Sequence, residues 1–235
     1  MGRSATARTT VPVGAFDGFR PAALAFFREL AANQDRAWFQ AHRDVYEREV
    51  LAPLHGLVAD LTVEFAQRGI KLSADPHKAV FRIHRDVRFS RDKSPYKTHA
   101  GAVLSRDGTK SGFGLLYIHI DPAGCFAASG FYQPDPKDLE ALRQAILDEP
   151  AAIHAALSSA FAAGCELMRE DALARLPRGF EHAAGSDAAD LLKLRNIVLR
   201  RAIPAADLAA PALVGSIAAF AETALPLLRF GWQAV

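Results

Sequence analysis

The stretch FGLLYIHIDPAGCFAASGF, residues 113–131, contains two of the strands that decide the fold. Its two ends, residues 113–120 and 125–131, alternate side-chain character along the chain in a way that is typical of strands. The DPAG sequence between them is a turn, because Pro and Gly favour turn conformations. Residues 101–104 form a similar segment, followed by a turn at Asp107-Gly108. Three such strands joined by short connections predict an antiparallel meander.

Helical patterns flank these strands on both sides. Pro21 stands where a first helical residue is expected, and apolar residues recur after it at helical spacing. The same reasoning predicts helices over residues 21–32, 36–50, 53–69, 137–147, 150–163, 205–209 and 211–228. Further short strands are expected at residues 79–84, 166–169 and 196–201.

These elements predict an α+β fold, in which N-terminal and C-terminal helices pack on the antiparallel sheet. The chain has no internal repeat and no low-complexity linker after its first 18 residues. We therefore expect a single domain over residues 19–235. Residues 1–18 lack a periodic apolar pattern and are expected to form a disordered lead-in.

The composition is typical of a soluble globular protein, with 50% hydrophobic residues and a net charge of +2. Cys125 and Cys165 have no Cys or His partner at metal-binding spacing, so zinc-ribbon and CxxC sites are excluded. Two distant cysteines and the lack of a secretory signal predict a cytoplasmic protein. The apolar run 211–228 contains Glu222 and Pro226, so we interpret it as a buried helix and expect no membrane association.

Positive charge is concentrated between Lys78 and Lys97, where seven Lys or Arg and two acids give a local net charge of +5. Residues 86–99 have no regular period, and long irregular connections in compact domains are often functional. Arg suits bidentate contacts with phosphate or carboxylate, and Lys adds point charges. We expect loop 82–97 to bind an anionic or phosphorylated small molecule. The expected ligand-binding residues are Arg82, Arg85, Arg88, Ser90, Asp92, Lys93, Tyr96 and Lys97.

Other interpretations of the same loop remain open. Alternation over residues 79–84 would place Arg85 on the core side, where a guanidinium needs a carboxylate or a bound anion. Asp92 is the nearest such partner if the loop folds back, and the charges would then form a structural network of ion pairs. A nucleic-acid surface could use Phe89 and Tyr96 for stacking. A protein-interaction surface without chemistry is the third alternative.

The sequence leaves open whether the protein is an enzyme. It lacks the GxSxG, Walker, GxGxxG and HExxH motifs, which excludes the easily recognised hydrolases, P-loop enzymes, dinucleotide binders and zincins. If it is an enzyme, His84 or Asp86 beside the arginines is the expected proton carrier. His119 and Asp121 would share a strand face, with His84 as a neighbour, but no second paired ligand motif supports a metal site. We therefore expect neither a metal nor another cofactor.

Several motifs give the chain a resemblance to a known family. The marks are NQDRAWF (33–39), FRIHRDVRFSRDKSPYKTHAG (81–101), LYIHI (116–120), GFYQPDPKDLEALRQAI (130–146) and KLRNIVLRR (193–201). With them the chain resembles a bacterial and fungal family catalogued as a domain of unknown function, or conserved hypothetical protein. RDVRFSRDKSPYK is its most specific mark. The resemblance spans residues 19–230 and implies a single α+β domain, but it implies no reaction and no catalytic residues.

Overall fold

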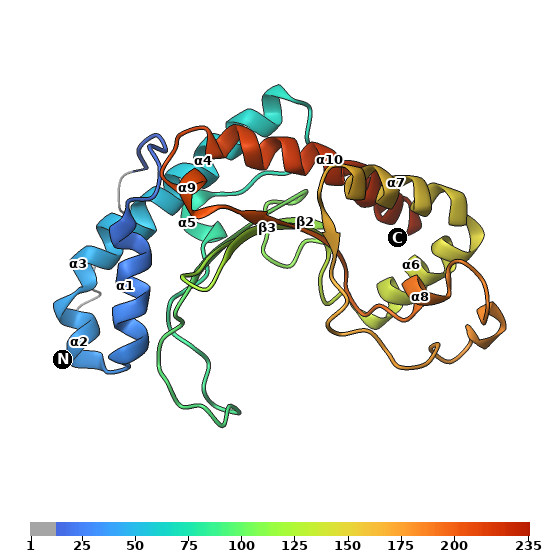
Figure 1. Cartoon of the computed structure of the whole chain (residues 1–235), viewed down its shortest axis with the longest axis horizontal. Helices are drawn as coiled ribbons and strands as arrows, with labels where there is room; N and C mark the ends of the chain where they lie inside the picture. Colours follow the sequence, from blue (N-terminus) through green and yellow to red (C-terminus); the bar gives the residue numbers. More distant parts are fainter. Residues whose placement is uncertain (1–12) are drawn as a thin grey trace, which may run out of the picture.

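One antiparallel sheet organises the computed structural model, which describes residues 13–235 (Figure 1). Its strands lie in the order β1-β2-β3-β5-β4, so the first three form the predicted meander. The strands are β1 (Ala100–Ser105), β2 (Leu115–Ile120), β3 (Cys125–Phe131), β4 (Glu166–Leu167) and β5 (Ile197–Ile203). The sheet and the helices around it confirm the α+β class.

The two faces of the sheet have different surroundings, because side chains alternate along each strand. In β2, Leu116, Ile118 and Ile120 are fully buried, whereas Tyr117 and His119 on the other face are only partly buried. The buried face packs against α4 (Ala52–Gln67) and α10 (Leu213–Ala234). The opposite face, which we call the open face, carries the polar and aromatic side chains of the meander.

The N-terminal helices largely follow the predicted ones. They are α1 (Pro21–Ala32), α2 (Arg36–Ala41), α3 (Arg43–Val45), the π-helical turn η1 (Tyr46–Leu51), α4 and α5 (Pro76–Ala79). Pro21 begins α1, and the Asp35 carboxylate caps α2 by accepting a backbone N–H at 2.8 Å. The single helix predicted over residues 36–50 is wrong, because the chain is interrupted at His42 and continues through η1 into α4. Pro53 therefore lies in the first turn of a helix that is already under way.

The C-terminal part contributes α6 (Pro136–Asp148), α7 (Pro150–Ala162), η2 (Glu181–Ala183), α8 (Ala189–Leu192), α9 (Ala205–Leu208) and α10. By length and composition α10 could cross a membrane. However, 56% of its 18-residue apolar stretch is buried inside the structure, and the helix packs against β3, α4 and α7. It begins two residues later than predicted, and residues along its whole length are buried in the core. Cys125 and Cys165 are both buried and do not form a disulfide with each other.

The chain is already packed before residue 19. Phe16 is 5% exposed, and its ring lies 5.4 Å from that of Phe19 in an edge-to-face contact. The backbone N–H of Phe16 donates to Asp60 Oδ2 at 2.8 Å. The prediction of a disordered lead-in is therefore corrected for residues 13–18, because an apolar side chain fixes this segment against α4. The rest of that prediction concerns residues 1–12, which lie outside the described part of the chain.

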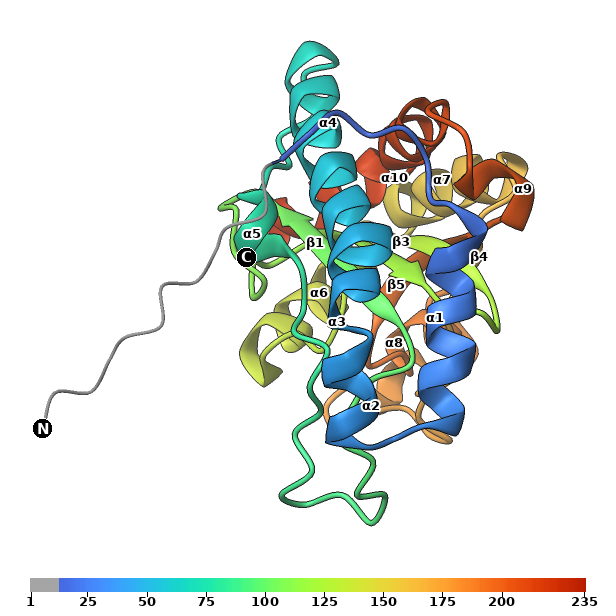
Figure 2. The same cartoon turned by 90° about the vertical axis from the view of Figure 1, so that its left-hand side faces the viewer.

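Residues 80–99 form a narrow projection, here called the arm. The strand predicted at residues 79–84 is wrong, because only isolated bridges occur there, from Val80 to Ala102 and from His84 to Tyr96. The two sides of the arm are joined by the N–H of Lys97 to the Ile83 carbonyl at 2.8 Å and by a second such bond beside it. Figure 2 shows the arm projecting beyond α2.

The elements are arranged as an arch around the open face of the sheet. In Figure 1, α1 to α3 and the arm descend on one side, whereas α6 and α8 lie on the other. The sheet lies between these two sides, with α4 and α10 above it. The open face is therefore flanked by two groups of elements that come from different parts of the chain.

Candidate functional site

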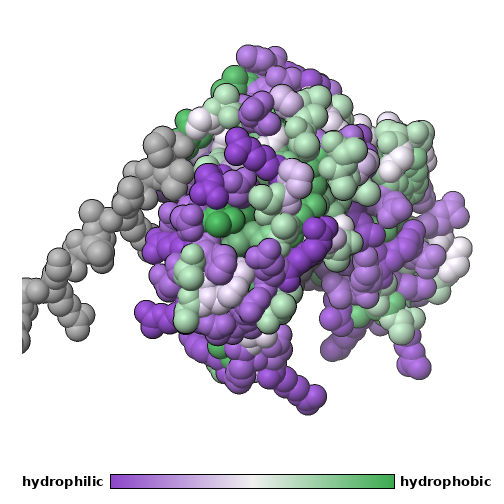
Figure 3. Space-filling view, turned by 60° about the vertical axis from the view of Figure 1, so that its left-hand side comes forward, coloured by the Kyte–Doolittle hydropathy of each residue, from purple (hydrophilic) through white to green (hydrophobic). Residues whose placement is uncertain are grey.

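A cleft of about 690 Å³ lies against the open face of the sheet. Alternate residues of the meander form its floor, and the base of the arm forms one wall. Residues 132–135 and Asp138, at the start of α6, form the other wall. Figure 3 shows hydrophobic residues gathered between two more hydrophilic parts of the surface. A volume of this size is typical of small-molecule sites.

Two lysines, Lys97 and Lys110, lie on the arm side of the cleft. The Nζ atoms of Lys97 and Lys110 lie 5.3 and 4.9 Å from the centre of the Phe81 ring. Lys110 Nζ also donates to the Val80 carbonyl at 2.7 Å. Neither ammonium group has a carboxylate partner among residues 13–235, and burial lowers the pKa of both. Nearby positive charge lowers them further, from Arg82 for Lys97 and from Lys97 for Lys110.

A second cluster lies at the end of β2, on the same face. The Tyr117 hydroxyl is 2.9 Å from His119 Nδ1, and His119 Nε2 is 3.5 Å from Asp121 Oδ2. His99 Nδ1 lies 3.9 Å from the same carboxylate oxygen. Burial lowers the pKa of both histidines and raises the pKa of Tyr117 to about 12. Gly101 makes room for this cluster, because a Cβ there would lie 2.6 Å from the Tyr117 oxygen.

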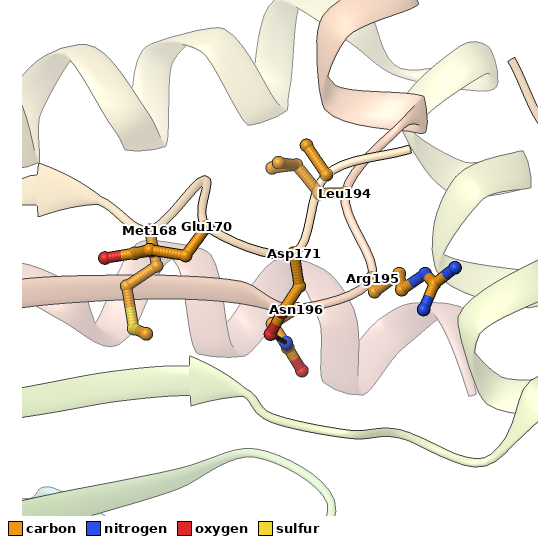
Figure 4. A pocket seen from close by; sticks show the side chains of 7 residues that line it. Met168, Glu170, Asp171, Leu194, Arg195 and Asn196 are labelled. Atoms are coloured by element: carbon orange, nitrogen blue, oxygen red, sulfur yellow. Dashed lines mark hydrogen bonds between the residues drawn. The ribbon is translucent and has the colours of Figure 1, made fainter. Parts of the chain in front are cut away.

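The far wall contains a residue in an uncommon backbone conformation. Gln133 has φ +46°, and its N–H donates to Asn196 Oδ1 at 2.6 Å. Asn196 in turn donates to Asp171 Oδ2 at 3.0 Å (Figure 4). The hollow beside these two side chains has a volume of about 10 Å³, enough for one water molecule. This hollow lies among residues that support the cleft wall, and it is too small to bind a ligand.

The charged residues of the loop predicted to bind an anion are largely paired within the arm. Arg85 forms an ion pair with Asp92, as the alternative interpretation of the sequence anticipated. Arg88 makes a bidentate contact with Asp86, at 2.7 and 3.0 Å. Lys93 Nζ donates to a backbone carbonyl of the arm at 2.9 Å. These contacts favour a structural role for the outer part of the arm, because they occupy the groups that would hold an anion.

The remaining predicted residues lie in three different places. Tyr96 is buried, stacks on Phe39 with ring centres 4.5 Å apart, and donates its N–H to Gln34 Oε1 at 3.1 Å. It therefore fixes the arm to α2. Arg82 and Ser90 make no side-chain hydrogen bond or ion pair within the described chain, whereas Lys97 alone of the predicted set lines the cleft. Gln34 was not predicted, although it lies within the NQDRAWF mark.

The two candidate proton carriers lie away from the cleft. His84 contacts the rings of Phe39 and Tyr96, with centroid distances of 6.0 and 5.2 Å. The hydrogen bonds from Arg88 hold the pKa of Asp86 below its usual range, so this carboxylate is a poor proton carrier.

His99, which the sequence reasoning missed, is the histidine that approaches His119 and Asp121. The register of the sheet pairs Ala100 with Ile120, so the residues next to this pair, His99 and Asp121, come together. His84, the neighbour considered from the sequence, contacts α2 instead. The only sequence signal for His99 was its place directly before a strand, and the register itself could not be deduced from the alternation.

Comparison with known proteins gives one result. The family model that matches this chain is described as "Conserved hypothetical protein (DUF2461)", and the match covers residues 22–230. This confirms the resemblance drawn from the arm and the strands. No curated protein and no solved structure matches the chain.

Proposed function

The chain belongs to the DUF2461 family of conserved hypothetical proteins, and we propose that this member binds an anionic small molecule in the cleft on the open face. One observation carries the proposal: Lys97 and Lys110 face the cleft without a carboxylate partner among the described residues. Burial disfavours their charged forms, and so does nearby positive charge, from Arg82 for Lys97 and from Lys97 for Lys110. A phosphate or carboxylate group between them would offset both effects.

The rest of the cleft suggests what the ligand carries besides its anionic group. Phe126, Phe131 and Tyr132 supply aromatic surface, and Tyr117 and Gln133 supply polar atoms. Pockets that bind small molecules commonly combine an apolar lining with a few polar groups that fix orientation. We therefore expect an anionic ligand with a flat or apolar body. Compared with the sequence prediction, the proposed anion contact moves from the outer arm to its base.

If the bound molecule reacts, the proton carriers are proposed to be in the Tyr117–His119–Asp121 cluster. His119 Nδ1 lies at hydrogen-bond distance from the Tyr117 hydroxyl, and Nε2 faces Asp121. Such an arrangement can position an imidazole for general acid–base catalysis. His84 and Asp86 do not line the cleft and are not proposed for this role.

Thermal unfolding and calorimetry with a ligand panel test the anion proposal. The panel contains inorganic phosphate, sugar phosphates, nucleotides and carboxylates, with neutral analogues as negative controls and EDTA in every sample. A ligand at 100 times its Kd should stabilise the fold by about 2.7 kcal/mol. Lys97→Gln and Lys110→Gln should each weaken binding at least tenfold. Lys78→Gln is the matched control, since Lys78 is 83% exposed and pairs with Asp75.

Two results would contradict the proposal. One is the absence of stabilisation by every anion of the panel while the protein remains folded. The other is anion binding that is equally strong in the Lys97→Gln, Lys110→Gln and Lys78→Gln variants, because it would place the anion elsewhere on the surface.

The arm tip supports a second candidate function. Phe89 is 96% exposed, and the Arg88 guanidinium lies 5.9 Å from its ring centre. An exposed aromatic residue among positive charges could stack on a nucleic-acid base or contact a protein partner. Binding of short DNA or RNA that weakens steeply with salt and is lost in Phe89→Ser would favour this function. Unchanged oligonucleotide binding in Phe89→Ser would exclude the arm tip as the nucleic-acid surface.

We also propose a cytoplasmic location. Both cysteines are buried and unpaired, which is typical of proteins in a reducing compartment. Fractionation of cells that produce the full chain tests this, and recovery mainly with the membrane or secreted fraction would contradict it.

A further inference from the structure

We propose that His99, His119 and Asp121 form a binding site for a divalent transition-metal ion, for which Zn²⁺ is the simplest occupant. This inference is independent of the anion proposal, but it replaces the role of His119 as a proton carrier, because a metal ion would occupy His119 Nε2. Each of the three residues offers one ligand atom, and these atoms all lie within 4.8 Å of one another. In a tetrahedral zinc site with bonds of about 2.0–2.2 Å, neighbouring ligand atoms are roughly 3.3–3.6 Å apart. The two distances to Asp121 Oδ2, 3.5 Å from His119 and 3.9 Å from His99, are close to that spacing.

The same distances are longer than expected for a close, hydrogen-bonded ion pair between Asp121 and either histidine. Charge-assisted hydrogen bonds between nitrogen and carboxylate are usually about 2.7–2.9 Å long. Asp121 Oδ2 is therefore too far from either imidazole for such a bond, although both rings face it. The separation leaves room for an ion between the three atoms.

Neighbouring groups hold the ligands in position. The Tyr117 hydroxyl contacts His119 Nδ1 at 2.9 Å, which leaves Nε2 to face the proposed ion. The other oxygen of Asp121, Oδ1, accepts the N–H of Ala123 at 2.7 Å. The His119 ring is stacked on Phe126, with centroids 4.6 Å apart and an angle of 23° between planes. Outer contacts of this kind are typical of metal sites because they orient the ligands.

The sheet supplies a rigid base for the site. His119 lies in β2, and the pairing of Ala100 with Ile120 brings together His99, directly before β1, and Asp121, directly after β2. Sites on regular elements hold their ligands more firmly than sites on loops. No rearrangement of the backbone is required to bring the three side chains together.

The ligand set indicates which metals fit and where the ion is accessible. Two imidazoles and one carboxylate suit Zn²⁺ and its neighbours in the first transition series, whereas Mg²⁺ and Ca²⁺ prefer oxygen ligands. Three protein ligands leave at least one position free. His99 and His119 line the cleft, with 35% and 16% of their side chains exposed, so the free position faces the cleft. A bound ion would thus be reachable by a molecule in the cleft.

Metal binding by the untagged, chelator-stripped full chain tests the inference. Equilibrium dialysis with Zn²⁺ in a phosphate-free buffer should give one tightly bound ion per chain. Co²⁺ should produce the visible absorption bands of a four- or five-coordinate site. His99→Ala, His119→Ala and Asp121→Asn should each weaken Zn²⁺ binding at least 100-fold, and Tyr117→Phe should weaken it about tenfold through loss of the outer contact.

Two further measurements keep the result unambiguous. His182→Ala, a change at an exposed histidine in η2, should bind Zn²⁺ like the unmodified protein. Thermal unfolding of each metal-free variant shows whether it is folded, and His99→Gln replaces His99→Ala if the latter is not. No bound Zn²⁺ in the folded protein would overturn the inference. So would binding that survives in folded His99 and His119 variants.

Discussion

His55 should make the stability of this protein depend on pH in the acidic range. It lies in α4, is 4% exposed, and its Nδ1 atom has no hydrogen-bond partner among the described residues. Burial lowers the pKa of His55 to about 4, and the His77 ring, 4.6 Å away, adds to the effect. Asp75 acts in the opposite direction but does not reverse the shift. The folded protein therefore binds a proton at His55 much less readily than the unfolded chain does.

The size of the effect follows from the difference between the two pKa values. An unperturbed histidine has a pKa of about 6.5, and each pKa unit corresponds to about 1.36 kcal/mol. A folded-state value of about 4 then predicts a loss of roughly 3 kcal/mol from the free energy of unfolding. The loss should begin as the pH falls below about 6.5 and be complete near pH 4, because only the unfolded chain is protonated in that window. Domains of this kind have a free energy of unfolding of about 5–15 kcal/mol, so the change is large.

Urea unfolding between pH 7 and pH 4 measures this dependence. His55→Leu removes the titrating group, so its free energy of unfolding should fall by roughly 3 kcal/mol less than that of the unmodified protein over the same range. His182→Leu, at an exposed histidine, should keep the original dependence. Equal pH dependence in the unmodified protein and His55→Leu would refute the reasoning. A His55 ring that titrates above pH 6 in the folded protein would refute it as well.

Two further changes test the packing around the cleft. Gly101→Ala should lower the free energy of unfolding by about 1–3 kcal/mol, because the new Cβ would lie 2.6–2.9 Å from atoms of the Tyr117 phenol. Urea unfolding measures this change. If the variant is as stable as the unmodified protein, the Tyr117 side chain can move away without cost. Arg143→Met should cost about 2–4 kcal/mol in the same assay, since Arg143 is 9% exposed and donates to the carbonyls of Leu192 and Leu194 at 2.9 and 3.0 Å. A cost below about 0.5 kcal/mol would mean that water replaces the guanidinium there.

The parts of the fold that could be predicted are those with a local cause. The alternation of Leu116, Tyr117 and Ile118 produces a strand with one buried face, and the structure has that strand. Pro21 favours the first turn of a helix and the Asp35 carboxylate favours a cap position, and both residues lie at helix starts in the structure. The segment 79–84 also alternates, but its side chains are divided between the cleft and the core without a continuous strand partner. Alternation alone could not separate these two cases.

The candidate site was harder to predict from the sequence, because it depends on contacts between residues that are far apart in the chain. The partnership of Arg85 with Asp92 spans seven residues and could be considered as an alternative. The approach of His99 to His119 and Asp121 depends on the register of β1 against β2, and no short motif encodes it. Lys110 lies in the connection after the Asp107-Gly108 turn and faces the same Phe81 ring as Lys97, and no local pattern marks that contact. Concentrated charge therefore drew attention to the arm, whereas the two lysines that line the cleft lie at its base and in the β1–β2 connection.

The arm gives the two ends of one short segment very different environments. Its tip, at Phe89, is in solvent, and its base carries Lys97 and His99 into the cleft. Between them, ion pairs and the stacking of Tyr96 on Phe39 stiffen the segment. Because Tyr96 is held against Phe39 between the two ends, a macromolecule that binds the tip should leave Lys97 and His99 in place. The tip and the cleft should then bind their ligands independently, with no coupling free energy between them.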